Sequence, residues 1–201
     1  MYLIKIDMDR SRRAIRSAMT DCQKMHRLLM GLFDMPRQEA QVLYRIKEQG
    51  IQIAVYLYSA VPVVEERLVP GMTLAGQRNV SSWLDSMKNG RLQRFDLLVM
   101  PSKKVPSAGK NSQRRVLRKQ EERTAWLRRK AEQNGFEICS LVEQGNTSFY
   151  GEHPKENGVM RWDSYHYTGM LRIVDQTAFQ HAVENGIGPG KAYGMGMLLL
   201  A

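Results

Sequence analysis

Four histidines are the side chains of this sequence best suited to move protons, because imidazole changes its charge near physiological pH. His26 falls about a quarter-turn from the centre of an apolar helical stripe, at the margin between core and water. A histidine there is held by packing and still reaches a substrate, so it can act as a general acid or base. A half-buried structural histidine fits the same position, and on this pattern alone it is the better interpretation.

The other histidines are weaker candidates for chemistry. His153 falls in a turn and His181 late in a short helix, where water is the expected neighbour, and His166 lies in a strand between two tyrosines. No serine, histidine and aspartate occur with a recognisable nucleophile spacing, and no close cluster of histidine, cysteine and carboxylate offers metal-ligand spacing. We therefore predict chemistry that needs neither a metal ion nor another cofactor.

The cysteines and the apolar runs indicate a compartment. Cys22 and Cys139 make neither a disulfide framework nor a zinc-binding CxxC pair. No apolar run approaches the roughly 18 residues that a membrane-spanning helix needs. The first residues, which include Asp7 and Asp9, are unlike a signal peptide. These features predict a cytoplasmic protein without a membrane partner.

The charge of the chain is concentrated in one segment. The 201 residues hold 30 lysines and arginines against 20 aspartates and glutamates, for a net charge of +10. Residues 103–130 alone carry eleven basic and two acidic side chains, which is almost the whole excess. A concentrated basic patch attracts a polyanion, and nucleic acid is the usual one. The alternative is a solvated, charged helix next to a loop.

The basic segment is predicted to be a loop over 102–113 followed by a helix over 114–133. Apolar residues gather on one side of that helix and basic residues on the other, with Trp126 among the basic ones. The basic face consists of Arg115, Arg118, Lys119, Arg123, Arg129 and Lys130. Trp126 can stack on a base or pack against another part of the protein, and packing is the favoured interpretation. The candidate phosphate contacts in this segment are Lys103, Lys104, Arg114, Arg115, Arg118 and Lys119.

A second candidate for phosphate binding is the glycine-rich stretch 186–196. Gly188 and Gly190 allow the backbone to come close to a phosphate, and Lys191 adds a positive charge. The stretch is not a nucleotide-binding P-loop, because Ala192 follows the lysine where serine or threonine is needed. Taken alone it is equally well explained as a tight crossover loop.

The pattern of elements predicts an α+β protein with two similar domains. Strands are expected over 2–8, 42–46, 51–57 and 95–99, and helices over 11–18, 22–34 and 78–88. This order, β, α, β, β, α, β, is that of a ferredoxin-like unit, the arrangement of RNA-recognition-motif domains. The second half repeats it, with a helix, extended runs over 136–142, 147–151, 159–167 and 170–174, a short helix that Asp175 caps and that runs to Asn185, and an apolar tail. We predict tandem ferredoxin-like domains over 1–101 and 114–201, joined by the basic linker 102–113.

Several motifs, in this order and at this length, resemble the CasE family of CRISPR-associated endoribonucleases, which process repeat RNA in type I-E systems. The resemblance runs end to end, and the C-terminal motif and the Ala-Trp-Leu helix are its most specific parts. The matching residues are Met25-His26-Arg27 with Leu32-Phe33, Arg94-Phe95-Asp96-Leu97 with Pro101 and Lys103, Ala125-Trp126-Leu127 with Arg129-Lys130, and Gly186 to Ala192 with Gly194, Gly196, Leu198 and Leu199.

The resemblance implies a substrate, a reaction and partners. It implies that the chain binds the stem-loop of the CRISPR repeat in precursor RNA and cuts it without a metal, leaving a 2′,3′-cyclic phosphate. The ribose 2′-OH beside the scissile phosphate is the implied nucleophile, and the helix histidine of the family, its central acid–base residue, corresponds to His26. It also implies that the protein stays on the mature guide RNA as a subunit of the Cascade complex.

Further RNA-binding residues follow from the same resemblance and from proximity in the sequence. Lys24 and Arg27 are the basic residues nearest His26. Lys155 and Arg161 match positions at which the family places basic side chains beside the RNA stem. Two positions depart from the family: Gln23 stands where some members have a helper tyrosine, and Met100 stands where the family has asparagine.

Two other functions stay open at this point. One is an RNA-binding subunit of the same kind of complex that has lost cleavage, and the other is a ribosome-associated or DNA-binding protein that uses the basic helix. Replacing His26 separates the first from an enzyme, and comparing RNA with DNA hairpins separates the second.

Overall fold

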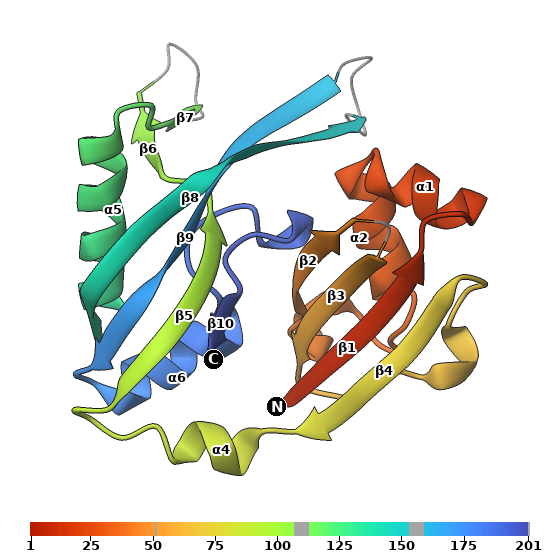
Figure 1. The fold of residues 1–201 in the computed structure, drawn as a ribbon, viewed down its shortest axis with the longest axis horizontal. Helices are drawn as coiled ribbons and strands as arrows, with labels where there is room; N and C mark the ends of the chain where they lie inside the picture. The colour runs from red at the N-terminus through yellow and green to blue at the C-terminus, as the bar shows by residue number, and fades with distance from the viewer. Residues whose placement is uncertain (51, 107–112, 153–158, 201) are drawn as a thin grey trace.

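The strands of the chain form two four-stranded antiparallel sheets and one two-stranded sheet, seen in the computed structural model of Figure 1. The structure describes residues 1–50, 52–106, 113–152 and 159–200. Of the helices in these ranges, none is long and apolar enough to cross a membrane.

The first sheet has the strand order β2-β3-β1-β4 and is covered by helices on one face only. Its strands are β1 (Tyr2–Asp9), β2 (Leu43–Gln49), β3 (Gln52–Ser59) and β4 (Met72–Asn79). Alternation along β1 buries Ile4, Ile6 and Met8 and turns the residues between them to the other face. The buried side chains share a core with those of α1 (Arg13–Met19) and α2 (Cys22–Met30). Two short elements, α3 (Arg37–Ala40) and the 3-10 turn η1 (Glu65–Arg67), lie in the connections.

The second sheet has the order β10-β5-β9-β8, and α5 lies along its outer side in Figure 1. Its strands are β5 (Leu92–Val99), β8 (Phe136–Glu152), β9 (Val159–Ile173) and β10 (Leu198–Leu200). The helices α5 (Gln120–Gln133) and α6 (Gln176–Asn185) supply buried residues such as Trp126 and Phe179 to its core. Asp175 caps α6 by accepting a hydrogen bond from the amide of Ala178, as predicted.

Three small elements complete the chain. α4 (Ser81–Asp85) connects the two sheets, β6 (Ser102–Val105) and β7 (Gln113–Val116) form the two-stranded sheet, and the 3-10 turn η2 (Lys191–Tyr193) lies in the glycine-rich loop. In both large sheets the strands, numbered within their unit, follow the order 4-1-3-2 of a ferredoxin-like fold. The prediction of tandem ferredoxin-like units is therefore confirmed.

The assignment of strand 95–99 to the first unit is wrong. In the structure this strand is β5, and it pairs with β9 and β10 of the second sheet. The fourth strand of the first sheet is β4, in a stretch where the sequence predicted no strand. β4 is a largely exposed edge strand that buries little besides Met72, so its sequence lacks the apolar alternation that marks a strand. The first sheet thus ends before residue 92, ahead of the predicted boundary at 101.

The predicted helix over 114–133 begins later, at Gln120. Arg114 and Arg115 lie instead on β7, and Arg118 and Lys119 lie in the connection that leads into α5. The predicted linker 102–113 contains strand β6, which pairs with β7 so that Lys104 faces Arg114. Backbone hydrogen bonds rather than an apolar face hold this pair of strands, so the hydrophobic pattern did not indicate it.

The two units meet through apolar contacts and a cluster of charges. Leu43 and Tyr58 of the first sheet are buried in the core of the second unit. Beside them Asp96 on β5 accepts a hydrogen bond from Lys47 at 2.9 Å and lies 3.0 Å from His166 Nε2. Arg45, 7% exposed, lies 3.5 Å from the same carboxylate. Burial acts to raise the pKa of Asp96, but the neighbouring His166, Lys47 and Arg45 outweigh this effect and lower the pKa to about 2.

Candidate functional site

Helix α2 places His26 at the edge of the first core. Asp21 caps the helix by accepting hydrogen bonds from the amides of Gln23 (2.8 Å) and Lys24 (3.3 Å). Met25 and Leu29, four residues apart, are buried against the sheet. His26 follows Met25 around the helix and is half-buried, at the margin between core and water that the sequence predicts.

Two segments of the second unit lie against the start of α2. Strands β8 and β9 pair from Phe136 and Ile173 out to Glu152 and Val159, beyond the end of β5. Residues 147–152 and 159–164 therefore form a two-stranded arm, which projects past the sheet in Figure 1. The arm lies so close to α2 that a Cβ on Gly151 would come within 2.8 Å of Cys22 Sγ.

The glycine-rich loop 186–196 is the second segment. The hydroxyl of Tyr44 donates to the carbonyl of Ala192 at 2.9 Å, and Gln23 Nε2 on α2 donates to the hydroxyl of Tyr193 at 2.9 Å. Gly188, with φ +78°, lies against Trp126, where a Cβ would come within 2.9 Å of the ring. The loop is thus a tight crossover that packs on both units. Trp126 is 3% exposed, so the packing interpretation of this residue is confirmed.

The other side of the loop borders a basic cavity of about 640 Å³. β6, β7, α5 and the loop all contribute to its walls. Its cationic lining residues are Lys103, Lys104, Arg114, Arg129, Lys130 and Lys191, and Gly188, His181 and Asn185 also line it. The described residues that line it include no aspartate or glutamate. A cavity with this charge suits a polyanion such as an RNA backbone.

The structure therefore brings together only part of the predicted phosphate-binding set. Arg115, Arg118 and Lys119 are exposed but do not line the basic cavity, and Gly190 packs against Met195 instead. Sequence reasoning left Arg129, Lys130 and His181 out of the site, although the basic face of the helix already included the first two. The sequence carries no signal for His181, because α6 joins the cavity only through the tertiary fold.

One arginine of the predicted basic face has a structural role. Arg123 is 7% exposed, binds Glu143 through two hydrogen bonds and lies 3.9 Å above the ring of Tyr165. The hydrogen bond to Glu143 raises the pKa of the Arg123 guanidinium above its ordinary value. This side chain is therefore unavailable to RNA.

The remaining predicted contacts lie near α2 or on the arm. Lys24 is 3.9 Å from Asp21, and exposed Arg27 donates weakly to the carbonyl of Gln23 at 3.5 Å. Arg161 is exposed on the arm and is oriented by Asp163, whose carboxylate lies 3.0 Å from the Nε atom of Arg161. Lys155 lies outside the described residues.

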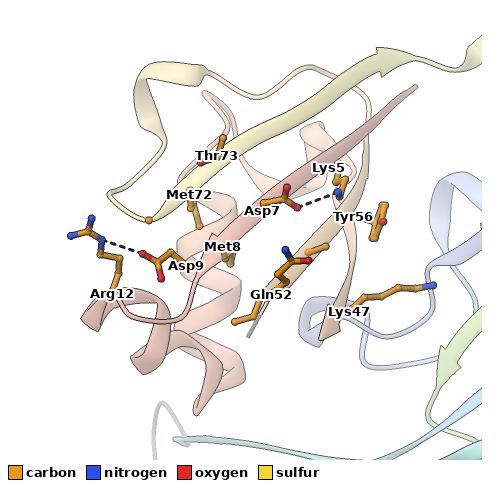
Figure 2. Close-up of a pocket in the computed structure, with 13 residues that line it drawn as sticks. Lys5, Asp7, Met8, Asp9, Arg12, Lys47, Gln52, Tyr56, Met72 and Thr73 are labelled. Carbon is orange, nitrogen blue, oxygen red and sulfur yellow. Dashed lines mark ion pairs between the residues drawn. The ribbon is translucent and has the colours of Figure 1, made fainter. Parts of the chain in front are cut away.

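Two further cavities of similar volume lie beside α2 and on the first sheet. One, of about 570 Å³, opens beside α2 and is lined by Met25, Tyr44, His166, Phe149, Tyr150 and Tyr193 among others. The other, of about 590 Å³, lies on the first sheet and is drawn in Figure 2. We call it the ion-paired cavity, because Lys5 lies 3.3 Å from Asp7 and Arg12 lies 3.5 Å from Asp9 on its walls. Within the described residues, no group of three or more histidine, cysteine or acidic side chains is placed to hold a metal ion.

Comparison with known proteins gives one consistent family. A family model described as "CRISPR associated protein" matches residues 1–201. CRISPR-associated endoribonuclease Cse3 from Thermus thermophilus is 25% identical over 217 residues, which cover 100% of both chains. A structure of Cse3 bound to a 19-nucleotide RNA superposes with a TM-score of 0.88 at 24% identity, covering 100% of both chains.

A third match comes from a larger assembly. A chain in a structure of a CRISPR RNA-guided surveillance complex, in a pre-nicking state, has a TM-score of 0.78 and 27% identity. The match covers 100% of this chain and 99% of that one. Because the family model and these relatives span the whole sequence, the resemblance to the CasE family is confirmed. The chain belongs to the family of CRISPR-associated proteins.

Proposed function

We propose that this chain is an endoribonuclease that binds the stem-loop of the CRISPR repeat and cuts precursor CRISPR RNA into guide RNAs without a metal ion. The observation that carries the proposal is the glycine-rich loop, which borders the basic cavity and contacts the helix that carries His26. Lys191 lines the basic cavity, and Tyr193, two residues later, contacts α2 at Gln23. We therefore infer that an RNA stem bound at the basic cavity extends toward α2 and His26. The relatives named as endoribonucleases support the same reading.

The proposed reaction is an in-line displacement within the RNA. The ribose 2′-oxygen forms a bond to phosphorus while the bond from phosphorus to the 5′-oxygen breaks. The 2′-OH loses its proton to a base and the leaving 5′-oxygen gains one, which leaves a 2′,3′-cyclic phosphate and a 5′-OH. His26 is the acid–base residue, and nearby cations such as Lys24 and Arg27 stabilise the charge that grows on the phosphate.

Binding of the stem uses electrostatics and shape. The cations of the basic cavity contact the phosphates of one side of the stem, and Arg161 on the arm contacts another part of it. Double-stranded RNA is recognised mostly through its backbone and A-form geometry, which suits charged side chains on strands and helices more than base-specific contacts. The arm projects beyond the sheet and is the element best placed to sense that shape.

We further propose that the protein stays with the guide RNA as a cytoplasmic subunit of a Cascade complex. The match to a chain of an RNA-guided surveillance complex along its whole length supports this. A subunit that keeps the guide RNA after cleavage needs an RNA-binding surface that is separate from the catalytic residue. The basic cavity and α2 provide that separation.

The decisive experiment replaces His26 with alanine and measures cleavage and binding of the cognate repeat hairpin separately. His26→Ala should lower the single-turnover rate by at least about 10²–10⁴, the usual contribution of general acid–base catalysis, and leave Kd within a few-fold. Wild-type cleavage should persist in excess EDTA and yield a 2′,3′-cyclic phosphate. A substrate with 2′-deoxyribose at the scissile position should bind and stay intact.

His181→Ala is the matched control, because it removes a histidine that lines the basic cavity away from α2. It should cut at close to the wild-type rate when the protein saturates the RNA. Near-normal cleavage by His26→Ala, or loss of wild-type cleavage in EDTA, would disprove the mechanism. A wild-type protein that binds the hairpin and never cuts it would instead be an RNA-binding subunit without activity.

A further inference from the structure

The phenol of Tyr193 lies against α2, the helix that carries His26. Its hydroxyl accepts a hydrogen bond from Gln23 Nε2 at 2.9 Å, across 170 positions of the sequence. Gln23 and His26 are three residues apart on α2, and side chains at that spacing are neighbours on a helix surface, with Cβ atoms about 5–6 Å apart. A phosphate within hydrogen-bond reach of His26 therefore comes close to this hydroxyl.

The fold holds the ring of Tyr193 from several sides. Trp162 of the arm stacks on it with ring centroids 4.5 Å apart and an angle of 34° between the planes. Gly190 and Gly194, with φ of +83° and +80°, bracket the 3-10 turn that carries the residue. The hydrogen bond from Tyr44 to the carbonyl of Ala192 fixes the turn to the first unit. The phenol is thus positioned before any ligand arrives, which is the condition for an effective catalytic donor.

The hydroxyl also keeps a proton to donate. Burial raises the pKa of Tyr193 above its ordinary value, so the phenol is protonated at neutral pH. Among the described residues, the hydrogen-bond partner of this hydroxyl is Gln23, which donates to it. A phenol that accepts one hydrogen bond still has its O–H to give to another group. A phosphate oxygen is a suitable acceptor.

We propose that Tyr193 is a catalytic residue of the cleavage reaction, whose hydroxyl donates a hydrogen bond to a non-bridging oxygen of the scissile phosphate. The inference rests on the proposed function. Negative charge on the non-bridging oxygens grows as the 2′-oxygen adds to phosphorus, so the hydrogen bond is stronger in the transition state than with bound substrate. Tyr193 keeps its proton throughout, and His26 carries out the proton transfers. Gln23 orients the phenol by donating to its oxygen.

The test compares Tyr193→Phe with the wild-type protein on the cognate repeat hairpin. The substitution removes the hydroxyl and keeps the ring that stacks on Trp162. Loss of one oxyanion donor typically costs about 10²–10³ in rate, so we expect a fall of about 100-fold in the single-turnover rate. Kd and the melting temperature should stay close to the wild-type values. Tyr56→Phe, which removes a phenol that lines the ion-paired cavity, should cut normally.

Phosphorothioate substrates separate a direct contact from a structural role. Sulfur in place of the oxygen that Tyr193 contacts should slow wild-type cleavage, because sulfur accepts hydrogen bonds poorly. The same diastereomer should have little further effect on Tyr193→Phe, whose hydroxyl is already gone. Wild-type rates for Tyr193→Phe, or a slow variant that keeps the full sulfur effect, would overturn the proposal while leaving the His26 result intact. A wild-type protein that cuts no hairpin would overturn both.

Discussion

Two cavities of similar size, on the two units of the molecule, carry their charges in opposite ways. The basic cavity, about 640 Å³, gathers six cations from β6, β7, α5 and the glycine-rich loop, and its described lining residues include no carboxylate. The ion-paired cavity on the first sheet, about 590 Å³, is lined by cations and acids together. In Figure 2 Lys5 points to Asp7 and Arg12 to Asp9. A third lining cation, Lys47, binds Asp96.

From this difference we expect the local arrangement of charge, more than the number of cations, to decide where a polyanion binds. A cation beside a carboxylate gives a phosphate little net attraction, whereas several cations without one raise the local potential. Cations that contact phosphates also release counterions from the RNA, which makes binding depend on salt. The first unit therefore supplies the candidate catalytic helix, and the second unit supplies most of the proposed binding surface.

Removing charge from the basic cavity should have the largest effect on RNA binding. Lys104→Ala with Arg114→Ala removes a facing pair of β6 and β7 and should weaken hairpin binding roughly 10- to 100-fold at moderate salt. Each lost phosphate contact should also reduce the log–log salt slope by about 0.7 to 0.9. Lys5→Ala with Arg12→Ala is the matched control, which removes two cations from the ion-paired cavity. Equal losses of affinity in the two double variants would contradict the comparison.

A medium effect, on stability, is expected from Asp96→Asn, which leaves Lys47 and Arg45 without their carboxylate. The lowered pKa of Asp96, about 2 against 3.8, corresponds to about 2 kcal/mol of native-state stability at neutral pH. A carboxyl with a lowered folded-state pKa stabilises the protein above its unfolded pKa, and this contribution disappears as the pH falls toward 2. Urea unfolding at several pH values measures both quantities.

The asparagine variant should therefore be less stable than wild type near pH 7 and lose less stability between about pH 4 and pH 2. Asp7→Asn, at an exposed ion pair with Lys5, serves as its control and should follow the wild-type profile. If Asp96→Asn and wild type have parallel profiles over this range, the carboxylate does not stabilise the contact between the units.

Making the ion-paired cavity basic should have the smallest effect, a slight gain in affinity for RNA. Asp7→Asn with Asp9→Asn removes the acids that face Lys5 and Arg12 and keeps the shape of both side chains. Because exposed ion pairs are weak, we expect only about a two- to threefold gain in affinity for an unstructured RNA. Filter binding at low salt, with Glu121→Gln and Glu122→Gln on α5 as an equal change of charge elsewhere, measures it. A loss of affinity would contradict the reasoning.

The fold shows which elements short-range sequence patterns predict correctly and which they do not. The alternation in β1, the apolar stripe of α2 and the Asp175 cap are local, so the sequence predicted them correctly. The assignment of β5 to the first sheet was wrong, because the apolar pattern of a strand does not indicate which strands it pairs with. The hairpin of β6 and β7 was missed because its strands are polar and rely on backbone pairing.

The candidate site likewise has features that the sequence predicts and features that only the tertiary structure determines. The sequence by itself determined that the excess charge lies in residues 103–130 and that His26 sits at the margin of an apolar stripe. Only the tertiary structure decided which of those charges face the basic cavity: it buries Arg123 against Glu143, places Lys104 and Arg114 on the cavity wall, and adds Lys191 from the far end of the chain. It also brings Tyr193 to Gln23 on α2. Charge and periodicity are properties of neighbouring residues, whereas these contacts join residues up to 170 positions apart, and long-range packing alone determines them.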